Sequence, residues 1–140
     1  MQRQIIFIIL VLLLTSCWQY DSDSKMLIGN YNICWVDNER WQTIMYDPNG
    51  KGGGSYETDP YIFAVGHNET YIIAKQHPLC KDYFGNGCMP DQNITNYFII
   101  NGISRQKFGP YTEKEFLEKK HELNIETLEF TKIFPDIPQN

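Results

Sequence analysis

From residue 27 onward, the chain is divided into short segments in which apolar and polar side chains alternate, with turn-forming residues between them. In the first of these, residues 27–36, Tyr31, Ile33 and Trp35 alternate with Asn32 and Cys34. A side-chain period of two is typical of a β-strand, because successive side chains point to opposite faces of a sheet. The pattern therefore predicts further strands at residues 41–46, 61–65, 71–75 and 96–101, a short one ending near 108, and one at 128–134. The first two pairs of segments predict hairpins.

Residues 109–124 have the features of a helix instead. Thr112 and Glu115 form a capping-box sequence, in which each side chain satisfies an unpaired backbone amide. Phe116, Leu117 and Leu123 make a narrow apolar stripe that suits a helix with one covered face. We therefore predict an α+β fold, with a mainly antiparallel sheet of about five to seven strands and one helix packed on it. It forms a single domain over residues 27–134, and residues 135–140 form a C-terminal tail.

The first 17 residues have the order of an export signal. Arg3 makes the start positive, residues 5–14 are an unbroken apolar run, and Thr15 and Ser16 are small. Ten apolar residues rise only about 15 Å as a helix, about half of the hydrocarbon core of a bilayer. A secretory signal therefore fits this segment better than a spanning helix does.

The residues at positions 14–17, Leu-Thr-Ser-Cys, resemble the lipobox of bacterial lipoproteins. The resemblance implies that residues 1–16 are a signal peptide that is removed, and that Cys17 carries a thioether-linked diacylglyceryl group. Each buried methylene contributes about 0.8 kcal/mol, so two or three acyl chains would hold the protein on a membrane durably. Residues 17–26 would then form a lipidated tether. The alternative is an ordinary signal peptide with a chance cysteine.

These features predict a protein of the bacterial cell envelope. Trp18 occupies the position where Asp would retain a lipoprotein in the inner membrane of proteobacteria, which favours the outer membrane over the cytoplasmic membrane. Loss of Arg3 with the signal takes the formal net charge from −5 to −6. An acidic chain is poorly suited to nucleic acid or to electrostatic docking on anionic lipid, so no nucleic-acid partner is expected.

Three cysteines remain after Cys17. Cys80 and Cys88 bracket a segment with Gly and Asn turn residues, which predicts a disulfide between them. In the loop-entropy model such a short loop contributes about 2.5 kcal/mol. Cys34 has no basic residue within the five positions before it, and we interpret it as a small buried apolar residue. A catalytic or redox thiol, or a part in a disulfide, is the alternative for Cys34.

The glycine run at residues 50–55 is not a phosphate-binding loop. Such a loop places its lysine after the last glycine and before a helix, whereas Lys51 precedes the glycines here. We interpret residues 47–60 as a loop, and loops on a rigid sheet often bind partners. The candidate partner-binding residues are Lys51, Gly52, Gly53, Gly54 and Tyr56.

The three histidines, His67, His77 and His121, lack the spacing of a metal site, and no C-x-x-C is present. We therefore predict no metal and no cofactor. No G-x-S-x-G nucleophile elbow occurs either. An enzyme built on this chain would be expected to place Cys34 or His67 in a cleft beside a base.

Four stretches, "GNY", "YIFAVGHNETYIIAKQHP", "NYFIIN" and "KFGPYTEKEFLEKKHELNI", together resemble a family of small, uncharacterised bacterial lipoproteins. The resemblance covers most of residues 27–125. It implies an architecture of strands followed by a capped helix, and it implies no activity.

The chain is rich in aromatic residues, with nine Tyr, eight Phe and three Trp. Many must fill the core, but Trp and Tyr exposed on a sheet also bind proteins or glycans. We expect a non-enzymatic, lipid-anchored binding module for a protein or for a wall or glycan partner, a class that includes inhibitor and immunity-type roles. The alternatives are a small hydrolase or thiol enzyme using Cys34 or a histidine, and a purely structural lipoprotein.

Overall fold

The computed structural model of the chain describes residues 22–36, 38, 40–79 and 89–134. Its described strands form two antiparallel sheets, ordered β1-β2-β3-β4 and β8-β7-β6-β5-β9. The elements are β1 (Ser22–Met26), β2 (Tyr31–Val36), β3 (Thr43–Tyr46), β4 (Ser55–Tyr56), β5 (Ile62–His67), β6 (Tyr71–Gln76), β7 (Asn96–Asn101), β8 (Lys107–Tyr111), α2 (Glu113–Glu122) and β9 (Lys132–Ile133).

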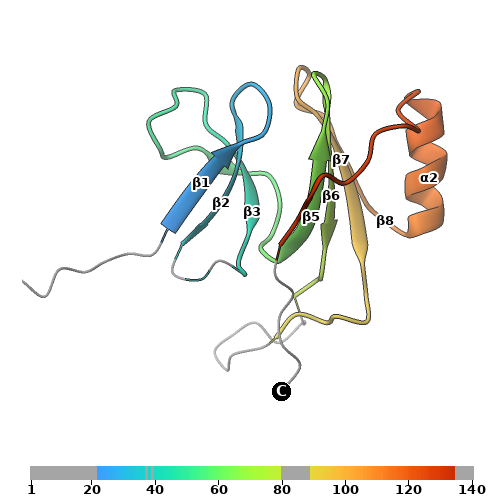
Figure 1. Cartoon of the computed structure of the whole chain (residues 1–140), viewed down its shortest axis with the longest axis horizontal. Helices are drawn as coiled ribbons and strands as arrows, with labels where there is room; N and C mark the ends of the chain where they lie inside the picture. The colour runs from blue at the N-terminus through green and yellow to red at the C-terminus, as the bar shows by residue number, and fades with distance from the viewer. Residues whose placement is uncertain (1–21, 37, 39, 80–88, 135–140) are drawn as a thin grey trace, which may run out of the picture.

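The described elements are stacked in three layers (Figure 1). The four-stranded sheet covers one face of the five-stranded sheet, and α2 covers the other face. The prediction of an α+β fold with mainly antiparallel strands and a helix packed on a sheet is confirmed. The prediction of one sheet of about five to seven strands is wrong, because the described residues form nine strands in two sheets.

A first hydrophobic core fills the space between the two sheets. The four-stranded sheet contributes Tyr31, Ile33 and Ile44, each fully buried. These side chains meet apolar residues of the five-stranded sheet, among them Val65, Ile72, Ala74, Phe98 and Ile100. The alternation along residues 31–35 therefore marks a sheet with one face on this core.

A second core lies between the five-stranded sheet and α2. Ile73 and Ile99 point to this side, whereas their neighbours Ile72 and Ile100 point to the first core. Phe116 is the buried residue of the helix stripe, with its ring centroid 4.9 Å from that of Tyr97. Because both faces of β6 and β7 are covered, their sequences contain consecutive apolar residues.

The N-terminal strand differs from the prediction. Residues 27–36 do not form one strand, because Gly29, at φ +53°, lies in a turn that joins β1 to β2. Ser22–Met26, predicted to belong to the tether, pairs with β2 as an edge strand whose side chains are all exposed. Backbone hydrogen bonding to a neighbouring strand needs no apolar pattern, so the polar sequence of β1 carried no sign of it.

The helix and the segment after it agree with the prediction in part. The capping box of Thr112 and Glu115 is confirmed. Leu117, however, is exposed, and the stem of Lys120 is buried in its place, with Nζ donating to the carbonyl of Leu128 at 2.7 Å. The predicted strand at 128–134 is reduced to Lys132–Ile133, because Ile125 and Leu128 pack into the second core instead.

Within the part of the chain that the structure describes, no helix is both long and apolar enough to cross a membrane.

Candidate functional site

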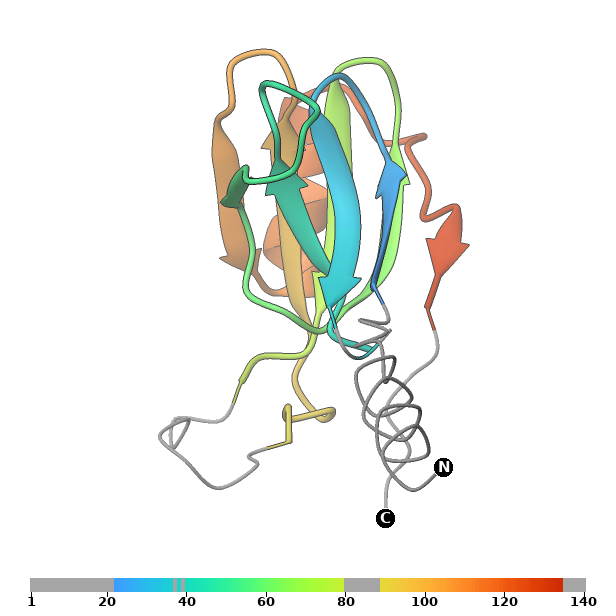
Figure 2. The same ribbon diagram turned by 90° about the vertical axis from the view of Figure 1, so that its left-hand side faces the viewer.

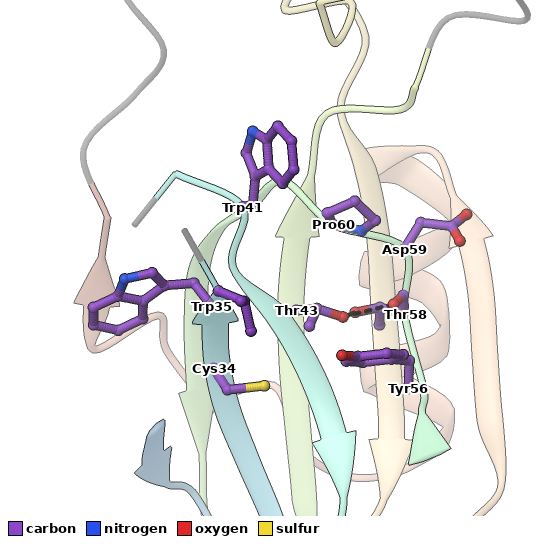
Figure 3. A pocket seen from close by; sticks show the side chains of 9 residues that line it. Cys34, Trp35, Trp41, Thr43, Tyr56, Thr58, Asp59 and Pro60 are labelled. Atoms are coloured by element: carbon purple, nitrogen blue, oxygen red, sulfur yellow. Dashed lines mark hydrogen bonds between the residues drawn. The ribbon is translucent and has the colours of Figure 1, made fainter. Parts of the chain in front are cut away.

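A pocket of about 250 Å³ lies on the face of the four-stranded sheet that points away from the first core (Figure 3). Its floor is formed by β2 and β3, and the chain from β4 to the start of β5 forms one wall. The described residues that line it are Cys34, Trp35, Val36, Trp41, Thr43, Tyr56, Thr58, Asp59 and Pro60. The pocket exists because strand pairing brings three separate segments of the sequence to one face.

The threonine hydroxyls at the pocket are already bonded within the protein. Oγ1 of Thr43 donates to the backbone carbonyl of Thr58 at 2.7 Å, and the two hydroxyl oxygens lie 3.3 Å apart. Oγ1 of Thr58 also accepts the backbone N–H of Ile44 at 3.1 Å. Hydroxyls bonded in this way offer little to a ligand, so the pocket presents a mainly apolar surface.

The wall of the pocket is fixed to the five-stranded sheet. Gln76, which is buried in β6, donates from Nε2 to the carbonyls of Asp59 and Pro60 at 2.8 and 3.1 Å. The N–H of Glu57 donates to the carbonyl of Ile44 at 2.8 Å. The wall is therefore part of the sheet framework rather than a loose loop, and the pocket is preformed.

Two aromatic side chains stand exposed at the rim. Tyr56 is 67% exposed and Trp41 is 46% exposed, with the Trp41 ring edge-on to Tyr61 at a centroid separation of 6.2 Å. Figure 3 shows the side chain of Tyr56 reaching toward Sγ of Cys34, whereas the Trp35 indole lies on the other side of β2. Exposed aromatic groups around an apolar hollow are typical of a binding hot spot.

Cys34 is a free, buried cysteine at the floor of the pocket. Burial raises the pKa of its thiol, which disfavours the thiolate form that a nucleophile requires. Its interpretation as a small buried apolar residue is confirmed. Asp59 is the lining residue of the described set that carries a charge, and no histidine of that set lines the pocket.

Only one of the five predicted partner-binding residues lies at the pocket. Tyr56 lines the pocket, but Lys51, Gly52, Gly53 and Gly54 do not. This stretch is held by the buried Asp47, whose carboxylate accepts the backbone N–H groups of Asn49, Gly50 and Gly52 at 3.1, 3.0 and 2.7 Å. Residues 55 and 56 then form β4, so the prediction of one uninterrupted loop over residues 47–60 is wrong.

The three histidines belong to different parts of the fold, and none of them lines the pocket. His67 ends β5, away from the pocket, and His121 lies 2.6 Å from a carboxylate oxygen of Glu126. Nδ1 of the buried His77 lies 2.9 Å from the carbonyl of Ile94, and its ring stacks on Phe63 at 4.3 Å. Among the described residues, no group of three or more His, Cys, Asp and Glu side chains is placed to hold a metal ion.

The structure also identifies pocket residues that the sequence did not single out. Trp41, Thr43, Thr58 and Pro60 join the pocket only through the pairing of β2, β3 and β4, and no local motif marks them. The available signal is Trp41, which begins the strand predicted at residues 41–46 and in the structure lies just before β3. The predicted lipidation site Cys17 and the predicted disulfide of Cys80 with Cys88 lie outside the described residues.

Comparison with known proteins yields one match. The model of a family described as "Protein of unknown function (DUF3997)" matches residues 28–134, which include both sheets apart from β1, together with the helix and the pocket. No curated protein and no solved structure matches the chain.

Proposed function

We propose that this chain, which belongs to the DUF3997 family of proteins of unknown function, is a lipid-anchored binding module of the bacterial cell envelope. In this proposal Cys17 carries the lipid, and the pocket between β2 and the β4–β5 wall binds an apolar group of a partner. No chemical step is assigned to the pocket. Inhibitor and immunity-type roles belong to this class of function.

The observation that carries the proposal is a preformed apolar pocket with exposed Trp41 and Tyr56 at its rim. Its volume of about 250 Å³ lies below the about 300–1,000 Å³ of typical small-molecule sites. A pocket of this size suits one aromatic or branched aliphatic side chain, the kind of group that anchors a protein interface. The pocket suits a glycan less well, because the threonine hydroxyls that line it already form hydrogen bonds within the protein.

The chemistry of the pocket also supports a binding role over the enzymatic alternative. An acyl-transfer or redox thiol needs a lowered pKa and a neighbouring base. Burial raises the pKa of Cys34 instead, and His67 does not line the pocket. His67 is the last residue of β5, whereas the pocket-lining Pro60 comes shortly before the first residue of that strand. These surroundings suit a thiol that completes an apolar floor.

Affinity capture from solubilised envelopes tests the pocket. The wild-type protein is compared with Tyr56→Ser and with Leu117→Ser, a control that changes an exposed side chain on α2. We expect one specific partner protein to be retained by the wild type and by Leu117→Ser and lost with Tyr56→Ser. Retention of the same partner by all three proteins would show that the pocket is not the binding site.

The anchor is tested separately. We expect the protein to incorporate radiolabelled palmitate and Cys17→Ala to abolish both the label and membrane attachment. Membrane attachment that persists in Cys17→Ala would refute the anchor and leave the pocket untouched.

A further inference from the structure

The pocket lies at the end of the molecule where the described chain begins. Ser22, the first residue of β1, pairs with Val36 at the end of β2. In the other sheet, the last residue of β6, Gln76, pairs with Asn96, the first of β7. A hydrogen bond of 3.0 Å from Ile62 to Gln42 joins the two sheets there. In Figure 2 this is the lower end of the domain, and we call it the anchor end.

Four exposed large apolar side chains of the described residues lie at the anchor end. Val36 is 47% and Trp41 46% exposed, and both line the pocket. Ile94, 49% exposed, follows in the segment that leads into β7 and is held there by the contact of its carbonyl with His77. Met89, 55% exposed, begins the same segment. Met26 and Ile103, 70% and 78% exposed, lie toward the opposite end, so exposure alone does not decide which end meets a partner.

The length of chain before β1 indicates what this surface meets. Four residues lie between Cys17 and Ser22, so the two positions are five residue steps apart and at most about 18 Å from each other when the chain is fully extended. A six-residue strand such as β7 is itself about 20 Å long. A lipid on Cys17 would therefore hold the anchor end closer to the bilayer than the opposite end, where the turn after β7 lies.

We propose that the anchor end docks on the surface of the lipid bilayer, with the side chains of Trp41 and Val36 in the headgroup region. The inference rests on the proposed function for the lipid at Cys17. Tryptophan favours this region because its ring is apolar while its N–H is polar. Asp59 at the pocket and Asp91 between Met89 and Ile94 are acidic neighbours of this surface, and Arg40 beside Trp41 is a basic one. Because the chain without Arg3 has a formal net charge of −6, we expect the contact to be apolar and stronger on zwitterionic than on anionic lipid.

Docking in this way limits the partner of the pocket. Val36 and Trp41 belong to both the docking surface and the pocket, so the pocket lies at the membrane surface. A partner must then present its apolar group within or next to the headgroup region, as a membrane protein does through its juxtamembrane residues.

Quenching of tryptophan fluorescence by lipids brominated on their acyl chains tests the docking. The full anchored chain is placed in phosphatidylcholine vesicles with Trp18→Phe and Trp35→Phe, so that Trp41 is the remaining tryptophan. Trp35→Phe removes no hydrogen bond seen among the described residues, because the buried indole N–H has no partner within them, and it keeps an aromatic ring beneath Lys25 Nζ. The control adds Trp41→Phe and Ile103→Trp, which moves the probe to an exposed position in the turn after β7.

We expect brominated lipid to cause a large loss of Trp41 emission and little loss in the control, and phosphatidylglycerol to reduce the loss at Trp41. Acylated protein in which Trp41 is not quenched, or in which both probes are quenched equally, would overturn the docking while leaving the anchor in place. Protein found by mass spectrometry to carry no acyl chain would overturn the anchor and the docking together. Thermal unfolding of each variant checks that it is folded.

Discussion

Replacing Gly66 with Ala tests how tightly the segment after the helix closes the five-stranded sheet. Gly66 lies in β5, and a Cβ atom built on it falls 1.9 Å from the carbonyl oxygen of Glu129 and 2.8 Å from its carbonyl carbon. Both contacts are with backbone, which has no alternative rotamer. The strand and the segment at residues 129–131 must therefore separate before Ala fits.

The separation would disturb contacts on both sides of the segment. The N–H of Thr131 donates to the carbonyl of Val65 at 3.0 Å, and this hydrogen bond lies next to the substitution. Phe130 packs against Phe116 with ring centroids 5.9 Å apart, and Nζ of Lys75 lies over the Phe130 ring at 4.7 Å. Overpacking costs about 1–3 kcal/mol and a lost hydrogen bond about 0.5–1.5 kcal/mol. We expect Gly66→Ala to lower the free energy of unfolding by about 2–4 kcal/mol.

Urea unfolding followed by circular dichroism measures this loss, with Gly102→Ala as the matched control. A Cβ on Gly102 falls 2.4 Å from Cδ1 of Ile28, the far end of a flexible side chain that can change rotamer. We expect the control to lose less than about 1 kcal/mol, because Ala also restricts the unfolded chain relative to Gly. Equal effects of the two substitutions would refute the close approach of residues 129–131 to β5.

Three further predictions concern Cys34 and the helix cap. Iodoacetamide should modify Cys34 far more slowly in the folded protein than in urea, because Cys34 is buried and burial raises the pKa of its thiol. Mass spectrometry measures both rates, and equal rates would show that the Cys34 thiol is accessible in the folded protein. Thr112→Ala should lower the free energy of unfolding by about 1 kcal/mol, because the backbone N–H of Glu115 loses the Thr112 hydroxyl that accepts it. Lys114→Ala should change the free energy of unfolding little, since the ion pair that Lys114 forms is exposed. Hydrogen bonds from the Thr112 backbone and hydroxyl lower the pKa of Glu115 from its ordinary value of 4.5. The ionised Glu115 side chain therefore stabilises the folded protein above pH 4.5, and this stabilisation is lost as the pH falls through the lowered pKa. Glu115→Gln should therefore flatten the dependence of unfolding on pH in that acidic range, and an unchanged profile would contradict the cap.

The parts of the fold that were predicted correctly are those decided by local sequence. The capping box at Thr112 needs only residues three apart, and the strand at residues 96–101 has a continuous pattern with the predicted bounds. The number of sheets was missed because alternation shows that a strand has a covered face but not which sheet covers it. The consecutive apolar residues of β6 and β7 were the available sign that both faces of the second sheet are buried.

The candidate site was predictable only in part for a similar reason. Tyr56 was selected from its place in a long polar stretch, and Cys34 was correctly interpreted as buried. That the two share one pocket depends on the register of β2 with β3 and of β3 with β4, in which Cys34 pairs with Thr43 and Met45 with Tyr56. Register of this kind is set by tertiary packing, and no local motif records it.

Site-specific photocrosslinking in living cells tests the central claim, that the pocket binds an apolar group of an envelope partner, most directly. A photoreactive phenylalanine analogue is placed at Tyr56 at the pocket rim and, in a second strain, at Leu117 on α2, since both positions are exposed. The account predicts a discrete crosslink to one envelope protein from position 56 and none from position 117. The same crosslinks from both positions, or none from position 56 in a membrane-attached protein, would contradict it.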